Sequence, residues 1–391
     1  MIESINIANQ GCQNIPDLSE YKHLKKLCCA LNRLESLPMV QTLTNLDCSH
    51  NQIEDIPYYP KLRILNCIGN EITLIVKFNH LVSLKCGSNN IEHIEPMETL
   101  IELACENNQL TEISGFPNLK KLVCFGNKIR QIESMNHLEY LSCSLNQLKE
   151  LPEFPNLKQL YCQYNHFTSL REYSKLEKLY CHHNKLHTIH ALQYLTDLNC
   201  KNNFIKKLPY LPKILYIDCR NNQIRMIQSS NTLVVLDCSH NKLSHLNHYD
   251  NLLELNCHDN MLYNLPILPK LSVLRCTNNY IESLPYLNMK EMGTICICDS
   301  SPIANLLSLE EFDHIMMYTP DYDQHKKISK KNIEIYYQFR FTYYCLKYKK
   351  QLRDILWEKI RKPKIEIQFS PMELKKYLEN KHDLDSLEDW N

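Results

Sequence analysis

Glycine is scarce in this chain of 391 residues: there are only six, and they stand well apart from one another. A phosphate-binding loop requires several glycines in close succession, because the backbone itself must wrap around the phosphate oxygens. The scarcity excludes a Gly-rich nucleotide-binding loop, and nothing else in the sequence points to a cofactor.

Net charge is also absent, since lysine plus arginine and aspartate plus glutamate are equal at 44 each. Such a chain has no overall field that would steer it to nucleic acid or to an anionic membrane. No stretch approaches the roughly 20 apolar residues of a membrane span. The first residues, MIESINIANQ, lack the basic and apolar regions of a secretory signal. We therefore expect a soluble, intracellular protein without a membrane partner.

Cysteine, in contrast, is abundant, and most of it recurs at one interval. A spacing set by an architectural period places the cysteines in equivalent positions, and reduced cysteine behaves as a small, readily buried apolar residue. We expect these side chains to fill the core rather than to form disulfides, because parallel strands hold equivalent side chains about 4.8 Å apart, farther than disulfide geometry allows. Fourteen of the nineteen cysteines follow this 19-residue interval: Cys29, Cys48, Cys67, Cys86, Cys105, Cys124, Cys143, Cys162, Cys181, Cys200, Cys219, Cys238, Cys257 and Cys276.

Aligned on these cysteines, the chain repeats the pattern Leu-x-x-Leu-x-Cys-x-x-Asn-x-Leu-x-x-Leu fourteen times, often with proline next. The second unit, for example, contains Leu46, Cys48 and Asn51. A partial unit with Gln10 in the asparagine position precedes the others, and we expect it to cap the array. The pattern resembles the signature of the leucine-rich-repeat family, with cysteine in the third leucine position. The resemblance covers residues 1–288.

The residue spacing agrees with the solenoid that this resemblance implies. Leu46 and Cys48 are two residues apart, so they share the buried face of a short strand. Asparagine recurs at fourteen equivalent positions, from Asn32 to Asn279, which suits a turn whose buried amide bonds to backbone groups. Too few residues remain in a 19-residue unit for a long helix, and prolines such as Pro57 mark the return leg.

The predicted fold is therefore an α/β-type repeat solenoid, a leucine-rich-repeat horseshoe. Short parallel β-strands form its concave face, its convex side is extended or 3₁₀, and a small C-terminal helical region follows. Residues 1–288 form the solenoid, from a partial N-terminal repeat and fourteen 19-residue repeats, and residues 289–391 form a cap and a mainly helical basic region with an acidic tail. The short unit is similar to the repeats of effector proteins that bacterial pathogens deliver into host cells.

The outward strand positions are the candidate partner-binding surface, because they line the concave sheet. Tyrosine is favoured at interfaces, since it offers a large amphipathic contact area at little rotamer cost. The alternative is that these tyrosines only stabilise the sheet through cross-strand contacts. Charged residues follow in the next repeats, including Asp218 and Arg220. The predicted partner-binding residues are Phe125, Tyr140, Tyr161, Tyr164, Tyr180, His182, His183 and Tyr216.

Four histidines lie close together in the sequence: His182, His183, His187 and His190. Histidine pairs can hold zinc, so these residues are candidate metal ligands. The nearest thiol, Cys181, occupies a buried position and points away from His182, so we expect no metal site. Two further cysteines at the end of the array, Cys296 and Cys298, are one residue short of Cys-x-x-Cys spacing and are interpreted as a terminal half-repeat.

Beyond about residue 290 the period is lost. Leu306–Met317 is expected to form a short helix, and the spacing over Asn332–Arg361 favours an amphipathic helix, although its first part also alternates as a strand would. Ser370 and Pro371 are expected to form the cap and first turn of a further helix over residues 372–378. Between Asp321 and Glu366 there are thirteen basic against six acidic residues, which is the texture either of a nucleic-acid surface or of a helix with a solvated basic side.

The ending LWEKIRKPKI, residues 356–365, is similar to a short tail found in proteins of giant DNA viruses, and it suggests a viral leucine-rich-repeat protein acting in the host cytoplasm. The predicted function is a non-enzymatic scaffold or adaptor that binds a protein partner, with a host protein as one candidate. Two alternatives stay open: a ubiquitin-ligase-like effector that uses Cys345, and nucleic-acid binding through the basic region, which we do not favour. The sequence leaves the oligomeric state open.

Overall fold

A computed structural model describes residues 2–18, 20–281, 294–298 and 315–318 of the chain. The chain divides into two compact units, Met1–Tyr318 and Thr319–Asn391, and the second lies outside the described residues. The described residues contain no helix, and hence none that could cross a membrane.

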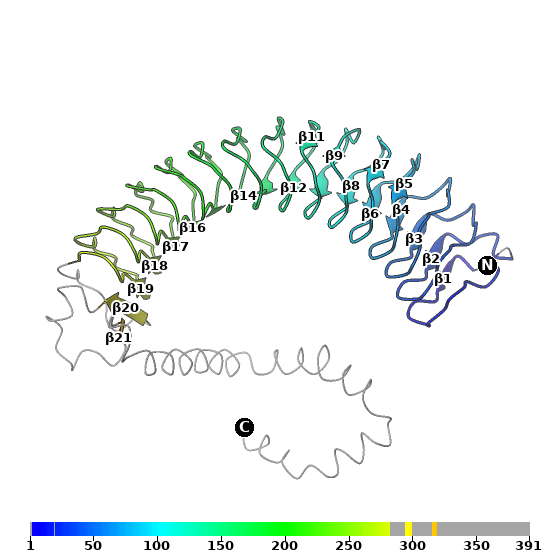
Figure 1. Ribbon diagram of the computed structural model, residues 1–391, viewed down its shortest axis with the longest axis horizontal. Helices are drawn as coiled ribbons and strands as arrows, with labels where there is room; N and C mark the ends of the chain where they lie inside the picture. The colour runs from blue at the N-terminus through cyan, green and yellow to red at the C-terminus, as the bar shows by residue number, and fades with distance from the viewer. Residues whose placement is uncertain (1, 19, 282–293, 299–314, 319–391) are drawn as a thin grey trace, which may run out of the picture. The chain divides into compact units, whose positions relative to one another are not determined.

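The first unit is a parallel β-solenoid in which each turn of the chain adds one strand to a sheet of seventeen strands. Equivalent positions of neighbouring repeats face each other: Leu46 pairs with Leu65, and Leu160 pairs with Leu179. The strands lie along the inner, concave side of the arc that this unit forms (Figure 1). They are β1 (Ser4–Asn6), β2 (Lys26–Cys28), β3 (Asn45–Asp47), β4 (Ile64–Asn66), β6 (Ser83–Lys85), β8 (Glu102–Ala104), β10 (Lys121–Val123), β12 (Tyr140–Ser142), β13 (Gln159–Tyr161), β14 (Lys178–Tyr180), β15 (Asp197–Asn199), β16 (Tyr216–Asp218), β17 (Val235–Asp237), β18 (Glu254–Asn256), β19 (Val273–Arg275), β20 (Thr294–Cys298) and β21 (Ile315–Tyr318).

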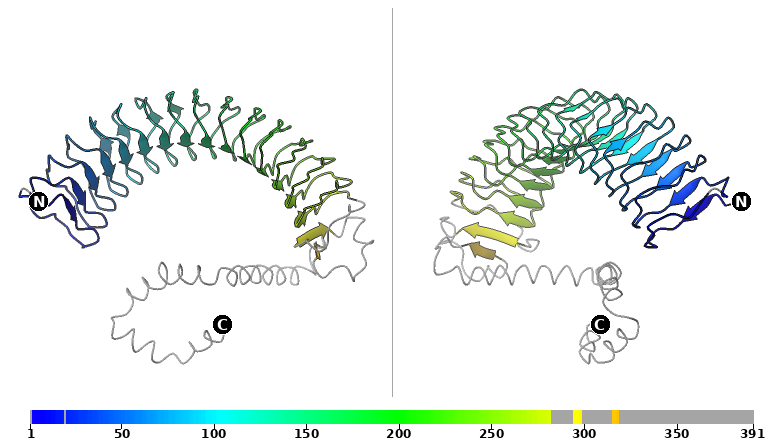
Figure 2. Two further views of the ribbon diagram at one scale, coloured as in Figure 1. Left: turned by 180° about the vertical axis from the view of Figure 1, so that it is seen from behind. Right: turned by 45° about the vertical axis from the view of Figure 1, so that its right-hand side comes forward.

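The return legs run along the outer side of the arc and are extended, as the prolines predicted (Figure 2). Proline fixes φ and donates no hydrogen bond, so it favours extended backbone over helix here. Four return legs contain two-residue strands that pair in parallel, β5 with β7 and β9 with β11. These are β5 (Leu74–Ile75), β7 (His93–Ile94), β9 (Glu112–Ile113) and β11 (Gln131–Ile132).

The core is one continuous column of leucine, isoleucine and cysteine side chains, which confirms the predicted burial. Leu141, Cys143 and Leu160 are each fully buried, and all fourteen periodic cysteines are buried as free thiols. Burial raises the pKa of the Cys143 thiol, so it stays protonated and apolar at neutral pH. Cysteine thus acts as a small core residue in the place where this repeat pattern more often has leucine.

The fourteen asparagines form a ladder, as predicted, in which eleven are buried and Asn32, Asn127 and Asn279 are half-buried. The amide of Asn146 donates to the carbonyl oxygens of Cys143, in its own repeat, and of Cys124, in the preceding repeat, at 3.1 and 3.0 Å. Its side-chain oxygen accepts the backbone N–H of Ile129 at 2.9 Å. The backbone cannot pair these groups where the chain leaves the strand, and an unpaired buried polar group is costly. The same bonds recur from repeat to repeat and tie each turn to its neighbour.

A second periodic feature is the residue two places after each cysteine, which adopts a left-handed backbone conformation. Its φ is 54° at Leu145, 55° at Tyr164 and 53° at Asp259. Asparagine, aspartate and histidine tolerate this conformation better than other residues with a Cβ, and they occupy many of these places. We call this place the turn position.

The predicted helix over Leu306–Met317 is wrong at its end, because Ile315–Tyr318 forms strand β21, which pairs in parallel with β20. A short apolar run such as IMM fits either structure by periodicity, and the open edge of the sheet supplies hydrogen bonds to a strand. Residues 306–314 and the predicted helices over Asn332–Arg361 and 372–378 lie outside the described residues. The division at residue 288 stays a prediction, although β20 and β21 continue the same sheet.

Candidate functional site

Each full repeat presents three outward positions on the concave sheet, followed by the turn position. In the repeat of Cys143 the first, second and third concave positions are Tyr140, Ser142 and Ser144, and Leu145 occupies the turn position. Because the repeats stack in register, each position forms a column that runs along the sheet.

Three predicted tyrosines form a continuous stack across neighbouring strands. The ring of Tyr161 lies 5.4 Å from that of Tyr140 and 5.0 Å from that of Tyr180, between ring centroids. Tyr161 and Tyr180 occupy the second concave position of adjacent repeats and pair in register, while Tyr140 lies diagonally in the first position. All three rings are half-buried, and the ammonium of Lys121 lies 5.6 Å from the Tyr140 ring centroid. These contacts make a tyrosine surface over β12, β13 and β14.

A second aromatic cluster lies beside this stack and involves the turn position. Tyr164 stacks on His183 with ring centroids 4.3 Å apart and meets the edge of His182 at 5.3 Å. Tyr164 and His183 are turn residues of adjacent repeats, which is why their rings are nearly parallel. The amide nitrogen of Asn202, the next turn residue, lies 2.8 Å from His183 Nε2. We call Tyr140, Tyr161, Tyr164, Tyr180, His182 and His183 the aromatic patch.

Two predicted residues lie outside these two groups of contacts. Phe125 is half-buried in the third concave position, beside the stack's N-terminal end. Tyr216 is in the first concave position of β16, two residues before the charged Asp218. Burial, followed by the nearby Asp218 carboxylate, raises the pKa of Tyr216 to about 12.

Charged side chains in the repeats C-terminal to the patch form an ion-pair network. Asp218 is buried, with only 1% of its side chain exposed, and it accepts hydrogen bonds from Nε and Nη2 of Arg220 at 2.9 Å each. Lys201 Nζ lies 4.0 Å from the same carboxylate, and Asp237 lies 3.6 Å from Arg220. The sequence indicated charged residues in these repeats but not the burial of Asp218, because that burial depends on how neighbouring side chains pack against it.

The four clustered histidines separate once the chain is folded. His182 and His183 are in contact, whereas His187 stacks on Phe204 and His190 lines another surface. The structure instead brings together three residues that sequence reasoning missed, His240, His258 and Asp259. His240 and Asp259 are turn residues of adjacent repeats, and His258 is in the third concave position beside Asp259. A comparison of these two columns in the sequence therefore predicts the group.

A groove of about 640 Å³ opens elsewhere, between neighbouring return legs. Phe154, Arg171 and Tyr173 are among the residues that line it, and none of the predicted partner-binding residues does. The predicted partner-binding surface and this groove are therefore separate features of the solenoid.

Protonation of His182 provides a test of how this surface is packed. Burial, with Lys201 as the next cause, lowers its pKa from 6.5 to about 4, so the folded chain holds the ring neutral where the unfolded chain protonates it. The unfolded state therefore binds more protons between pH 6.5 and pH 4, and stability falls as the pH drops through this window.

In urea titrations we expect His182→Gln to reduce the loss of unfolding free energy between pH 7 and pH 5 by about 1 kcal/mol, a value discounted for partial exposure. Gln163 already occupies the same position in the preceding repeat, so the change fits locally. The exposed His190→Gln serves as control. Equal pH slopes for wild type and His182→Gln would show that burial does not affect this ring.

Comparison with known proteins identifies the fold. No protein-family model matches the chain, and no curated protein matches it. Among solved structures, a leucine-rich-repeat protein of Leptospira interrogans, LIC12759, is 21% identical with a TM-score of 0.66, over 81% of this chain and 95% of that one. The leucine-rich effector YopM of Yersinia pestis is 25% identical with a TM-score of 0.66, over 75% and 88%.

A third similar structure is the functional domain of InlJ from Listeria monocytogenes, described as including a cysteine ladder. It is 23% identical with a TM-score of 0.51, over 76% of this chain and 67% of that one. Together these structures show that the solenoid of this chain has the leucine-rich-repeat fold.

Proposed function

We propose that the chain is a non-catalytic scaffold that binds a protein partner on its concave sheet. Phe125, the aromatic patch and Tyr216 form the contact surface. The observation that carries the proposal is the joining of Tyr140, Tyr161 and Tyr180 into one stack, directly beside the Tyr164 and His183 pair. Hot spots of protein interfaces are enriched in tyrosine and cluster near the centre of the contact.

The surroundings of the patch also favour a protein partner. Charged side chains follow it along the sheet, from Lys178 and Asp197 to Arg220 and Asp237, as a polar rim follows an apolar interface core. Gln163 Oε1 and His182 Nδ1, in adjacent third concave positions, have no hydrogen-bond partner among the described residues. If the two side chains reorient when a partner binds, the partner can supply a hydrogen bond to each of these atoms.

An intracellular setting belongs to the same proposal. The periodic cysteines are free thiols, which is the state that a reducing cytosol maintains. The similarity of residues 356–365 to giant-virus proteins suggests the cytoplasm of an infected host, but these residues and Cys345 lie outside the described part of the chain.

The test is affinity capture from a host-type lysate with full-length variants. We expect a captured partner to be retained by wild type and lost, with affinity at least about 100-fold lower, from the triple variant Tyr161→Ala, Tyr164→Asn, Tyr180→Ala. Asparagine is used at residue 164 because it tolerates the left-handed turn position.

The matched control replaces three tyrosines on the return legs that are equally large and more exposed, Tyr194, Tyr210 and Tyr263, with alanine. Both triple variants must show wild-type circular dichroism. Equal capture by both, or capture that depends on Lys347, Lys349 and Lys350 and disappears after nuclease treatment, would contradict the proposal and favour the basic region as the binding element.

A further inference from the structure

Three metal-ligand side chains meet at one point near the C-terminal end of the described array. His240 is the turn residue after strand β17, and Asp259 is the turn residue after β18, 19 positions later. His258 precedes Asp259 in the third concave position, and the backbone N–H of His240 donates to the carbonyl oxygen of His258 at 2.9 Å. The stacking of two repeats therefore brings these side chains together.

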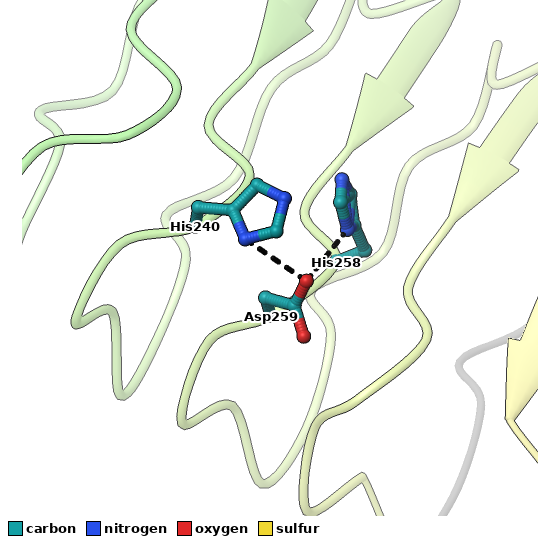
Figure 3. Close-up of side chains that lie close together, drawn as sticks. All are labelled: His240, His258 and Asp259. Carbon is teal, nitrogen blue, oxygen red and sulfur yellow. Dashed lines mark hydrogen bonds and ion pairs between the residues drawn. The ribbon is translucent and has the colours of Figure 1, made fainter. Parts of the chain in front are cut away.

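The donor atoms converge on one carboxylate oxygen (Figure 3). Asp259 Oδ2 lies 3.0 Å from His240 Nδ1 and 3.1 Å from His258 Nδ1. One ligand atom from each of the three residues lies within 4.8 Å of the others. In a tetrahedral zinc site, with ligand bonds of 2.0 to 2.2 Å, neighbouring ligand atoms are about 3.4 Å apart. The two distances from Asp259 Oδ2 to the histidine nitrogens are close to this spacing.

The remaining oxygen of the carboxylate has its own partner. Asn278, the turn residue of the next repeat, donates its amide to Asp259 Oδ1 at 2.6 Å. This bond holds the carboxylate with Oδ2 towards the histidines, which is the role that outer-shell hydrogen bonds have in metal sites. His240, His258 and Asp259 expose between 28% and 45% of their side chains, so an ion can enter from solvent.

The local charges are compatible with a bound cation. Burial lowers the pKa of His258, which is the direction that favours the neutral, metal-binding form of imidazole. The carboxylates of Asp259 and Asp237 favour a positive charge at this site, and the guanidinium of Arg275 opposes it. Two carboxylates thus face one fixed positive charge at this site.

The other adjacent histidine pair provides an internal comparison. His183 occupies the position of His240, but the following repeat has Lys201 and Asn202 at the positions of His258 and Asp259. Lys201 adds a positive charge there, and burial, followed by this charge, lowers the pKa of His182 and of His183. Within the described part of the chain, only the His240, His258 and Asp259 group combines three such donors.

We propose that His240, His258 and Asp259 bind one divalent transition-metal ion of the zinc class through two imidazole nitrogens and one carboxylate oxygen. This donor set suits zinc and its neighbours rather than calcium or magnesium, which prefer all-oxygen sites. Three protein ligands leave a coordination position for water or for a side chain of another molecule. The alternative is an ordinary carboxylate that accepts two hydrogen bonds from histidine.

The experiment titrates Co²⁺ alone, and then Zn²⁺ alone, into the full-length chain after chelator treatment, in the presence of a non-thiol reductant. We expect one Co²⁺ per chain with visible d–d absorption and no thiolate-to-cobalt charge-transfer band, and displacement by Zn²⁺. Asp259→Asn and His240→Asn should each weaken binding at least about 100-fold, since even outer-shell changes cost 10–100-fold, and Asn278→Ala should weaken it about 10-fold.

The substitutions to asparagine keep a residue that tolerates the left-handed turn, so the fold is retained, and the urea midpoint of each variant checks this. The matched control is His183→Asn, the same change at the same position of another repeat, which should bind like wild type. Binding that is absent, that is equal in Asp259→Asn and wild type, or that shows a thiolate band would overturn the proposal.

Discussion

Replacing Asn89 by alanine is expected to lower the free energy of unfolding by about 3 kcal/mol, because a buried N–H loses its acceptor and two carbonyl groups each lose a donor. Asn89 Oδ1 accepts the N–H of Ile72 at 3.1 Å, and its amide donates to the carbonyl oxygens of Cys67 and Cys86 at 3.0 and 3.1 Å. Each carbonyl keeps a second asparagine donor from a neighbouring repeat, so the orphaned N–H dominates the cost.

The exposed neighbour Asn90 provides the control, since Asn90→Ala changes the same residue type one position away without touching the ladder. We expect its effect to stay within about 0.5 kcal/mol. Asn89→Asp should be at least as harmful as alanine, because a carboxylate would face the same carbonyl oxygens. Urea unfolding followed by circular dichroism measures all three, and equal stabilities of the alanine variants would refute a structural role for the ladder.

Removing the guanidinium of Arg220 has the second large expected effect. Arg220→Ala leaves the buried Asp218 carboxylate without its two-bond partner, and loss of one member of a fully buried pair costs about 3–5 kcal/mol. Since Arg220 is 40% exposed and Lys201 lies nearby, we expect about 2 kcal/mol in the same urea assay.

Two comparisons separate this effect from simple truncation. Lys158→Ala breaks the exposed pair between Lys158 and Glu139, whose side chains are 46% and 44% exposed, and should leave the urea midpoint close to that of wild type. Adding Asp218→Asn to Arg220→Ala should restore part of the stability, because it removes the uncompensated charge. If the double variant is less stable than Arg220→Ala, the carboxylate is not the source of the cost.

Two expectations about function depended on which side chains the repeat brings together, those for the aromatic surface and for metal binding. The prediction of an aromatic binding surface rests on the period, and ring contacts link six of the eight predicted residues in two groups of three. The expectation of no metal site considered only histidines close in sequence, such as His182 and His187. In a solenoid, residues 18 or 19 apart are the true neighbours, as His240 and Asp259 demonstrate.

The amino-acid sequence alone determined the solenoid, its buried cysteines and leucines, the asparagine ladder and the extended return legs. Each is a property of one repeat that recurs identically, so local pattern and tertiary environment agree. The helix expected up to Met317 failed because a short apolar run carries no period of its own, and the open sheet edge selected a strand.

Only the tertiary structure decided which side chains act together on the concave face. The period places Tyr161 beside Tyr180, but the diagonal contact with Tyr140 depends on ring orientation. Likewise, the burial of Asp218 and the convergence of His258 on Asp259 depend on side-chain conformations that neighbouring repeats impose from both sides. Backbone position follows from the repeat, whereas side-chain direction follows from packing between non-identical repeats.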